Sequence, residues 1–187
     1  MSDVQAERET IDTLRIAHAE FRRVLGNVTP DQWTWPTPSD DWDVRALVNH
    51  VVQGNRWVER NVNAEGAEFP TDNFVGEGDP IEVFDASMLD LWAAIDAATS
   101  EQRLNDWYVG TRSSEFMIHG WDLAKATGQD TNLAPELNEP LLAAYRIGFD
   151  GYDRSKDGLY KEEFPVPSDA PAADRLAGFL GKRVQVN

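Results

Sequence analysis

The sequence predicts an all-α fold: a bundle of four helices with one long crossover loop and a short C-terminal extension. Apolar residues recur every three or four positions in four substantial segments, as on amphipathic helices, and one long segment between them has no periodicity. At 187 residues, with 41% hydrophobic content, seven Trp and eight Phe, the chain is long enough to bury a core. We therefore expect residues 1–187 to form a single helical domain, with the extension at about 150–187.

The first expected helix covers residues 5–25, which carry apolar side chains at helical spacing, and Gly26 directly after it is a plausible stop. The next segment, VTPDQWTWPTPSDDWD, spans residues 28–43 and contains three prolines and three tryptophans. Proline favours an extended backbone at the residue before it, and tryptophan rings bury much surface. We expect an ordered, extended connection that is packed by its rings.

A second helix is expected from a cap at Asp40 or Asp41 to about Val62, with Asp43 favourably placed in its first turn. Its buried stripe consists of valines and a leucine that share one face. Residues 63–80 then mix glycine, proline and acidic residues without periodicity, so they should form a long loop. Long loops in compact domains often cover an active site.

A third helix is expected within residues 81–99, where bulky apolar side chains form one face. The fourth should cover about residues 111–127, because Gly128 suits the position that follows a helix. A fifth should cover about residues 139–149, with Pro140 in its first turn.

The C-terminal extension carries weaker signals. GLYKEEFPVP, residues 158–167, predicts either a short strand or an extended arm. ADRLAGFLGKR, residues 173–183, predicts a short closing helix. The sequence contains no internal repeat and no low-complexity segment.

Composition excludes several classes of function. The chain has 17 Lys and Arg against 33 Asp and Glu, and its net charge of −16 repels phosphate backbones and anionic lipids, so neither nucleic acid nor a membrane is an expected partner. No apolar run approaches the roughly 20 residues that span a bilayer, and the acidic N-terminal segment lacks a signal-peptide core, so we expect a cytoplasmic protein. Because the chain has no cysteine, thiol chemistry would need a thiol from outside. Phosphate-binding loops and serine-hydrolase motifs are absent as well.

Three side chains could form a metal site. Glu115 and His119 stand four residues apart on the fourth expected helix, so both project from one face about one turn apart. His50 lies among valines, on or beside the core face of the second helix. Two imidazoles and one carboxylate from two facing helices would leave coordination positions open, as in catalytic sites, and suit zinc, iron(II) or nickel. The residues alone leave another interpretation, in which the pair is a chance spacing and His50 is a hydrogen-bonded core residue.

Other polar and aromatic residues have simpler interpretations. His18 is expected to pack beside the core of the first helix, whereas Asp122 and Lys125 are expected to be surface charges of the fourth. Three arginines could meet anionic substrate groups, although ion pairs with Asp or Glu are the commoner use in so acidic a chain: Arg45, Arg56 and Arg112. Four tryptophans could line a pocket, although core packing is the simpler expectation: Trp42, Trp57, Trp107 and Trp121.

Two segments resemble the actinobacterial branch of the DinB/YfiT-like superfamily, which includes the N-terminal domain of mycothiol-dependent maleylpyruvate isomerase. They are QWTWPTPSDDWDVRALVNHVV and EFMIHGWDLAKATGQ, and the resemblance covers about residues 10–130, with a weaker similarity in FPVPSDAPAADRLAGFLGK. It implies a DinB-like four-helix bundle that holds a divalent metal, commonly zinc, through His50, Glu115 and His119. It also implies that the metal binds the sulfur of mycothiol, a low-molecular-weight thiol, and yields a thiolate that attacks an electrophilic carbon.

The sequence departs from this family in two places. The isomerase carries an additional C-terminal domain that this sequence lacks, so maleylpyruvate isomerisation is not expected. Many relatives have Cys-Ser where this chain has Ser39 and Asp40, a position that we assign to the helix cap rather than to the metal.

The leading hypothesis is a cytoplasmic, metal-dependent mycothiol S-transferase that adds the thiolate to a small electrophile, with the 63–80 loop shaping the electrophile pocket. A second hypothesis keeps the metal and drops the thiol, as in an isomerase, hydrolase or cyclase. A third is a non-catalytic metal-binding or stress-associated protein, for which a homodimer through an exposed helix face is one option.

Overall fold

The predicted all-α fold is confirmed by a computed structural model of the chain. Every regular element in the described part of the chain is helical, and strand-type pairing there is limited to one isolated bridge between Pro36 and Asp43. None of the described helices is long and apolar enough to cross a membrane. The structure describes residues 3–39, 42–63, 66–98, 106–154 and 160–184.

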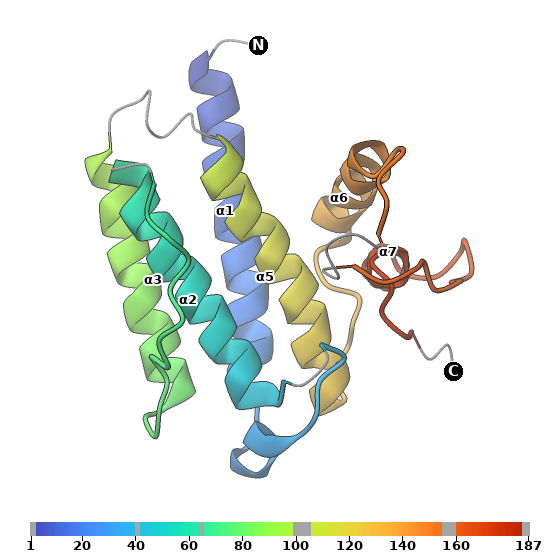
Figure 1. The fold of residues 1–187 in the computed structure, drawn as a ribbon, viewed down its shortest axis with the longest axis horizontal. Coiled ribbons are helices and arrows are strands. Elements are labelled where there is room, and N and C mark those ends of the chain that lie inside the picture. Colours follow the sequence, from blue (N-terminus) through green and yellow to red (C-terminus); the bar gives the residue numbers. More distant parts are fainter. Residues whose placement is uncertain (1–2, 40–41, 64–65, 99–105, 155–159, 185–187) are drawn as a thin grey trace.

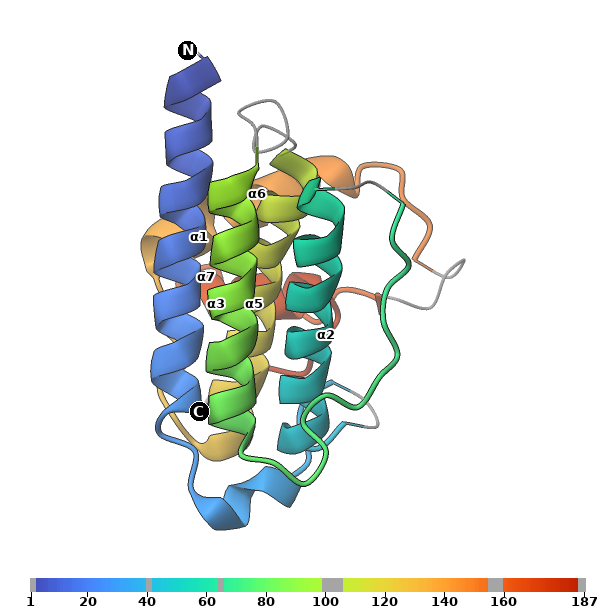
Figure 2. The ribbon, with the colours of Figure 1, turned by 90° about the vertical axis from the view of Figure 1, so that its left-hand side faces the viewer.

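Four long helices lie side by side as a bundle (Figure 1). They are α1 (Asp3–Leu25), α2 (Val44–Asn63), α3 (Pro80–Ala97) and α5 (Asp106–Thr127). Helix α1 packs mainly on α5, whereas α2 packs on both α3 and α5. Figure 2 shows the long connection from α2 to α3 running back along the outer side of α2. The bundle with one long crossover is therefore the observed arrangement.

Two shorter helices beside α5 form the C-terminal extension, which begins at Pro135 rather than at about residue 150 (Figure 1). These are α6 (Pro135–Gly148) and α7 (Ala172–Phe179), which pack on each other, and α7 also packs on α5. The segment before α7 is an extended arm rather than a strand, and its Phe164 N–H donates to the Gly178 carbonyl at 2.8 Å. A Cβ at Gly178 would lie 2.8 Å from the Phe164 oxygen, so glycine permits this close approach.

Aromatic rings fill the centre of the core. Phe21 of α1, Phe84 of α3 and Phe116 of α5 are fully buried, and their ring centroids lie 5.0 to 6.0 Å apart in tilted or edge-on arrangements. His18 packs beside this cluster, with its ring 5.8 Å from that of Phe84, as predicted. The three rings thus join α1, α3 and α5.

The tryptophan-rich connection between α1 and α2 is ordered and packed by its rings, as predicted. It includes a short 3-10 helix, η1 (Pro30–Thr34), which the expected extended conformation did not include. Trp33 and Trp42 pack partly buried against the core, while Trp35 is 41% exposed.

The cap of α2 differs from the prediction by a few residues. The helix begins at Val44, and the Asp43 carboxylate accepts a hydrogen bond from the Ala46 N–H at 2.8 Å. Asp43 is therefore the N-cap rather than a residue of the first turn. The predicted caps, Asp40 and Asp41, lie outside the described residues.

Two later helices begin earlier than predicted. Helix α5 begins at Asp106 rather than at residue 111, and the added turn buries Val109. Helix α6 begins with Pro135, because the first helical position needs no N–H donor. Pro140 therefore lies inside α6 and not in its first turn.

Phe21→Ala should lower the free energy of unfolding by about 3–5 kcal/mol, because it leaves a cavity where three helices meet. Ile16→Ala is the control on the same helix, since Ile16 is 40% exposed, and its cost should stay below about 1 kcal/mol. Urea unfolding followed by circular dichroism measures both losses. Equal losses in the two variants would contradict this description of the core.

Candidate metal centre

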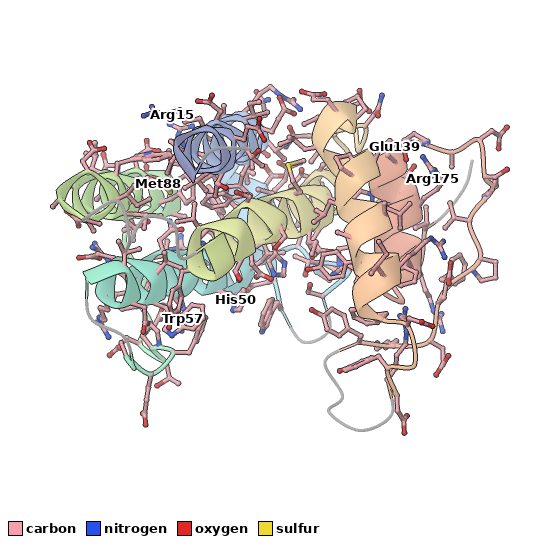
Figure 3. All side chains as sticks on the ribbon, turned by 90° about the horizontal axis from the view of Figure 1, so that it is seen from above. Arg15, His50, Trp57, Met88, Glu139 and Arg175 are labelled. Atoms are coloured by element: carbon pink, nitrogen blue, oxygen red, sulfur yellow. The ribbon has the colours of Figure 1, made fainter. Side chains whose placement is uncertain are left out.

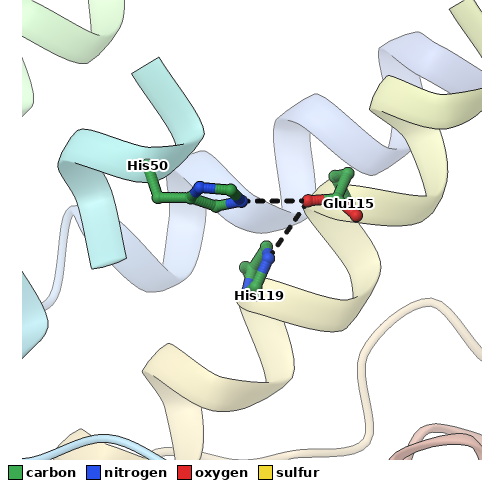
Figure 4. A group of neighbouring side chains, drawn as sticks. All are labelled: His50, Glu115 and His119. Carbon is green, nitrogen blue, oxygen red and sulfur yellow. Dashed lines mark hydrogen bonds and ion pairs between the residues drawn. The ribbon is translucent and has the colours of Figure 1, made fainter. Parts of the chain in front are cut away.

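His50, Glu115 and His119 come together where α2 faces α5 (Figure 4). One possible ligand atom from each lies within 4.8 Å of the other two. Glu115 Oε2 lies 3.4 Å from His50 Nε2 and 3.1 Å from His119 Nε2. Because Glu115 and His119 are four residues apart on α5, both project toward α2, which supplies His50.

The chemistry of these three donors fits a divalent metal ion. Two imidazole nitrogens and one carboxylate oxygen are ligands that zinc, iron(II) and nickel accept, and three protein ligands leave positions open for water or substrate. The side chains are enclosed but reachable, since 23% of His50, 24% of Glu115 and 10% of His119 is exposed. The group could therefore hold a metal ion that a small molecule can approach.

A buried carboxylate lies directly behind His119. Asp122 is fully buried, and its Oδ2 lies 3.0 Å from His119 Nδ1 and accepts hydrogen bonds from Ser39 Oγ at 2.9 Å and Lys182 Nζ at 2.8 Å. The prediction that Asp122 is a surface charge is wrong, although Lys125 is partly exposed. Ser39 reaches Asp122, so its assignment to the helix cap is wrong too. The spacing of three residues from His119 could have predicted Asp122, but no local pattern predicts its contacts with Ser39 and Lys182.

Arg112 lies one turn before Glu115 on the same face of α5 and is almost fully buried. Its guanidinium donates to Asn55 Oδ1 at 3.2 Å and to the Val51 carbonyl at 3.1 Å. A Cβ at Gly54 would lie 2.8 Å from Arg112 Cζ, so only glycine leaves room for this side chain. Among the described residues Arg112 forms no ion pair, in contrast to its simpler interpretation; it is a buried cation whose charge acts on Glu115.

The sequence model of the mycothiol maleylpyruvate isomerase N-terminal domain family matches residues 14–124, more than half of the chain. The chain belongs to this family. It is similar to an uncharacterized protein of Mycobacterium tuberculosis, found in two strains, with 34% identity over 177 residues that cover 90% of this chain and 95% of the relative. No solved structure matches the chain significantly. The match to the mycothiol maleylpyruvate isomerase N-terminal domain includes His50, Glu115, His119 and Asp122, and it ends before the C-terminal extension.

In this family member, aromatic side chains surround His50. Its ring centroid lies 4.5 Å from that of Trp42 and 5.6 Å from that of Phe69, and Phe69 also packs on Trp57 at 5.9 Å. Phe69 belongs to the connection between α2 and α3, which Gln53 of α2 holds through a hydrogen bond to the Asp72 carbonyl. The predicted loop thus packs its Phe69 ring against His50.

A cavity of about 330 Å³ opens beside His50. Six of its eight lining residues carry polar side chains, and one of them, Arg45, donates to the Gly76 carbonyl at 3.0 Å. Glu115 and His119 are not part of the lining, so His50 is the residue that joins the cavity to the group of three. The lining residues are Trp42, Asp43, Arg45, Ala46, Asn49, His50, Gln53 and Asn73.

Two of the remaining candidates from the sequence have roles away from this group. Arg56 forms an ion pair with Glu59, as its simpler interpretation predicted. Trp121 is buried and contributes to the packing of α7 on α5, again as predicted. The side chain of Trp107 lies outside the described residues.

The charges of the group depend on one another. Burial raises the pKa of the Glu115 carboxyl, but the charge and hydrogen bond of His119 lower it. Hydrogen bonding to His50 and the charge of Arg112 act in the same direction, so the pKa of Glu115 lies well below its usual value. Burial lowers the pKa of His119, whereas Glu115 and Asp122 raise it, to about 9. The pKa of His50 is lowered, chiefly by burial. The metal-free protein at neutral pH therefore holds an ionised Glu115 between a protonated His119 and a neutral His50.

In metal-free protein, the His119 ring should titrate near pH 9 and the His50 ring below pH 6.5, as measured by the C2–H signals in NMR spectra. Because the pKa of His119 is raised on folding, its stabilising contribution is present below about pH 6.5 and is lost as the pH rises through about 9. The unfolding free energy of His119→Gln should accordingly decline less over that window. Asp122→Asn, which removes the carboxylate charge, should lower the His119 midpoint; a midpoint at or below 6.5 in the unaltered protein would contradict the buried ion pair.

Proposed function

We propose that this chain is a divalent-metal-dependent enzyme that uses mycothiol as its thiol, with His50, Glu115 and His119 as the metal ligands. One observation carries the proposal: in a member of a family named for a mycothiol-dependent isomerase domain, two imidazoles and a carboxylate converge within 4.8 Å. The reaction that we favour joins the whole mycothiol molecule, through its sulfur, to a small electrophile. Zinc is the metal that we favour, with iron(II) or nickel as alternatives.

A divalent ion bound here would lower the pKa of a thiol and favour the nucleophilic thiolate. The protein's own contribution is to hold the ligands and the reactants. His50 and His119 present Nε2 toward Glu115, and Asp122 accepts a hydrogen bond from the Nδ1–H of His119, which leaves Nε2 free to bind. Since the chain has no cysteine, the sulfur must come from a second molecule.

The cavity beside His50 suits this use. Its volume of about 330 Å³ is at the lower end of the range for small-molecule sites, and the Trp42 and Phe69 rings cover part of the His50 ring. We propose that the loop that carries Phe69 shapes the space for the electrophile. In an addition, the sulfur–carbon bond forms as a carbon–carbon π bond breaks, and the thiol proton ends on the neighbouring carbon. In a substitution, that proton leaves with the departing group.

Purified protein should contain one divalent metal ion per chain by elemental analysis, and His50→Ala, Glu115→Ala and His119→Ala should each lose most of it. His18→Gln is the control, because His18 is the third histidine and packs beside the aromatic core. A wild-type protein that cannot be loaded, or loading that survives Glu115→Ala combined with His119→Ala, would overturn the metal site.

Metal-loaded protein should consume a thiol-reactive electrophile only when mycothiol is present, and His50→Ala should lower the rate by at least about 100-fold. Chromatography coupled to mass spectrometry would measure the mycothiol adduct. Turnover that needs metal but no thiol would point instead to an isomerase, hydrolase or cyclase. Equal activity of wild type and His50→Ala would indicate a protein whose metal group is not catalytic.

A further inference from the structure

Three segments from different parts of the chain meet at one oxygen atom behind the candidate metal site. Asp122 Oδ2 lies within hydrogen-bond distance of His119 on α5, Ser39 in the connection before α2, and Lys182 directly after α7. The Lys182 ammonium also lies 3.2 Å from Ser39 Oγ, so the contacts close into a triangle. The Lys182 side chain is only 15% exposed, which distinguishes it from a surface ion pair.

We propose that Lys182 is a positioning residue of the metal site: it fixes the Asp122 carboxylate, which in turn fixes the His119 ring. The C-terminal extension would then be part of the metal centre, although it lies outside residues 14–124 that match the family. This inference rests on the proposed function, because it requires a metal at His119.

The charges explain why Asp122 needs a cation from outside its own helix. A histidine that binds a metal through Nε2 is neutral and carries its hydrogen on Nδ1, so it donates a hydrogen bond to Asp122 but no charge. A fully buried carboxylate without a cation is strongly unfavourable. In the described part of the chain, Lys182 is then the one cationic side chain within ion-pair distance of Asp122.

The end of α7 aims Lys182 at this position. The Lys182 N–H donates to the Ala177 carbonyl at 2.9 Å and the Gly181 N–H donates to the Gly178 carbonyl at 2.9 Å, the two bonds of a Schellman cap. Gly181 takes the left-handed conformation, with φ of 84°, that the cap requires. The chain therefore reverses direction immediately before Lys182.

Trp121 fixes the position of α7 along α5. Its buried ring packs against Ala173 and Ala177, and its Nε1 donates to Asp174 Oδ1 at 2.7 Å. Because Trp121 immediately precedes Asp122 in α5, this contact brings the end of α7 beside Asp122. Helix docking and the Lys182 contact thus support each other.

If Lys182 has a positioning role, removing its charge should weaken metal binding rather than strengthen it. Charge alone would make metal binding tighter when a nearby positive group is removed, because like charges repel. Loss of position has the opposite result: Asp122 is left buried without its cation, His119 loses its fixed orientation, and binding weakens. Removal of such supporting partners commonly costs 10- to 100-fold in metal affinity.

Lys182→Met should weaken zinc binding about tenfold, as measured by competition with a chromophoric chelator. It should also alter the visible spectrum of the Co²⁺-loaded protein, which reports ligand geometry. Lys182→Arg keeps the cation, so its zinc affinity and Co²⁺ spectrum should stay close to those of the wild-type protein. Glu139→Gln is the matched control: it removes the ion pair of Glu139 with Arg175, which joins α6 to α7 in the same extension (Figure 3), and should leave zinc affinity unchanged.

A double-mutant cycle separates the proposed route from a general effect on the fold. If Lys182 acts through Asp122, Lys182→Met should have no further effect on zinc affinity in an Asp122→Asn background. Unchanged or tighter zinc binding by Lys182→Met, or an equal loss in Glu139→Gln, would overturn the proposal. If those results appear while wild type still binds zinc through His50, the proposed metal site stands and only the role of Lys182 fails. A wild-type protein without a metal site would overturn both.

Hydrogen exchange gives a second readout in case Lys182→Met folds poorly. Coupling between two sites is reciprocal, so zinc should slow amide exchange in residues 172–184 of the wild-type protein about tenfold. This zinc effect should disappear in Lys182→Gln, which removes the cation, if the contact between Lys182 and Asp122 transmits it. Identical exchange of this segment with and without zinc in the wild-type protein would contradict the proposal.

Discussion

Helix α5 carries ionic side chains into the interior of the bundle, and the surrounding structure has to neutralise them. Arg112, Glu115, His119 and Asp122 follow one another at intervals of three or four residues, so they share one face of the helix. In the metal-free protein at neutral pH their charges alternate in sign along that face. Removing one member of a buried ionic group typically costs about 3–5 kcal/mol, because its partner is left unpaired. The position of every segment that touches this face is therefore constrained.

Each neighbouring segment supplies groups that compensate one or more of these charges. Helix α2 accepts hydrogen bonds from Arg112 through Asn55, and Gly54 leaves room for the guanidinium. The same helix brings His50 to Glu115, so α2 contacts both Arg112 and Glu115. The extension supplies a lysine for Asp122. Packing of the bundle and assembly of the candidate site consequently depend on the same contacts, and a change in one is expected to disturb the other.

The sequence could predict the parts of this arrangement that have a local pattern. Helical periodicity gave the four long helices, and four-residue spacing on one face paired Glu115 with His119. The starts of α5 and α6 were predicted too late. Burial of Val109 favours an earlier start of α5, and Pro135 rather than Pro140 occupies the first turn of α6. The sequence predicts a surface position for Asp122 because a charged residue in a helix is usually exposed, whereas the cation that compensates its buried charge lies 60 residues away. Contacts between segments so far apart leave no periodic signal in a single sequence.

The ion pairs of the metal-free protein also prepare the candidate site for a metal. Glu115 already lies within 3.4 Å of both Nε2 atoms, so the three ligands need little rearrangement to share one ion. In the proposed metal-bound state, Glu115 would exchange the positive charge on His119 for that of the ion, and its own charge would stay compensated in both states. Proton and metal therefore compete for the same nitrogen of His119. Because the pKa of that ring is raised to about 9, the competition extends through neutral pH, and metal affinity should rise with pH across this range.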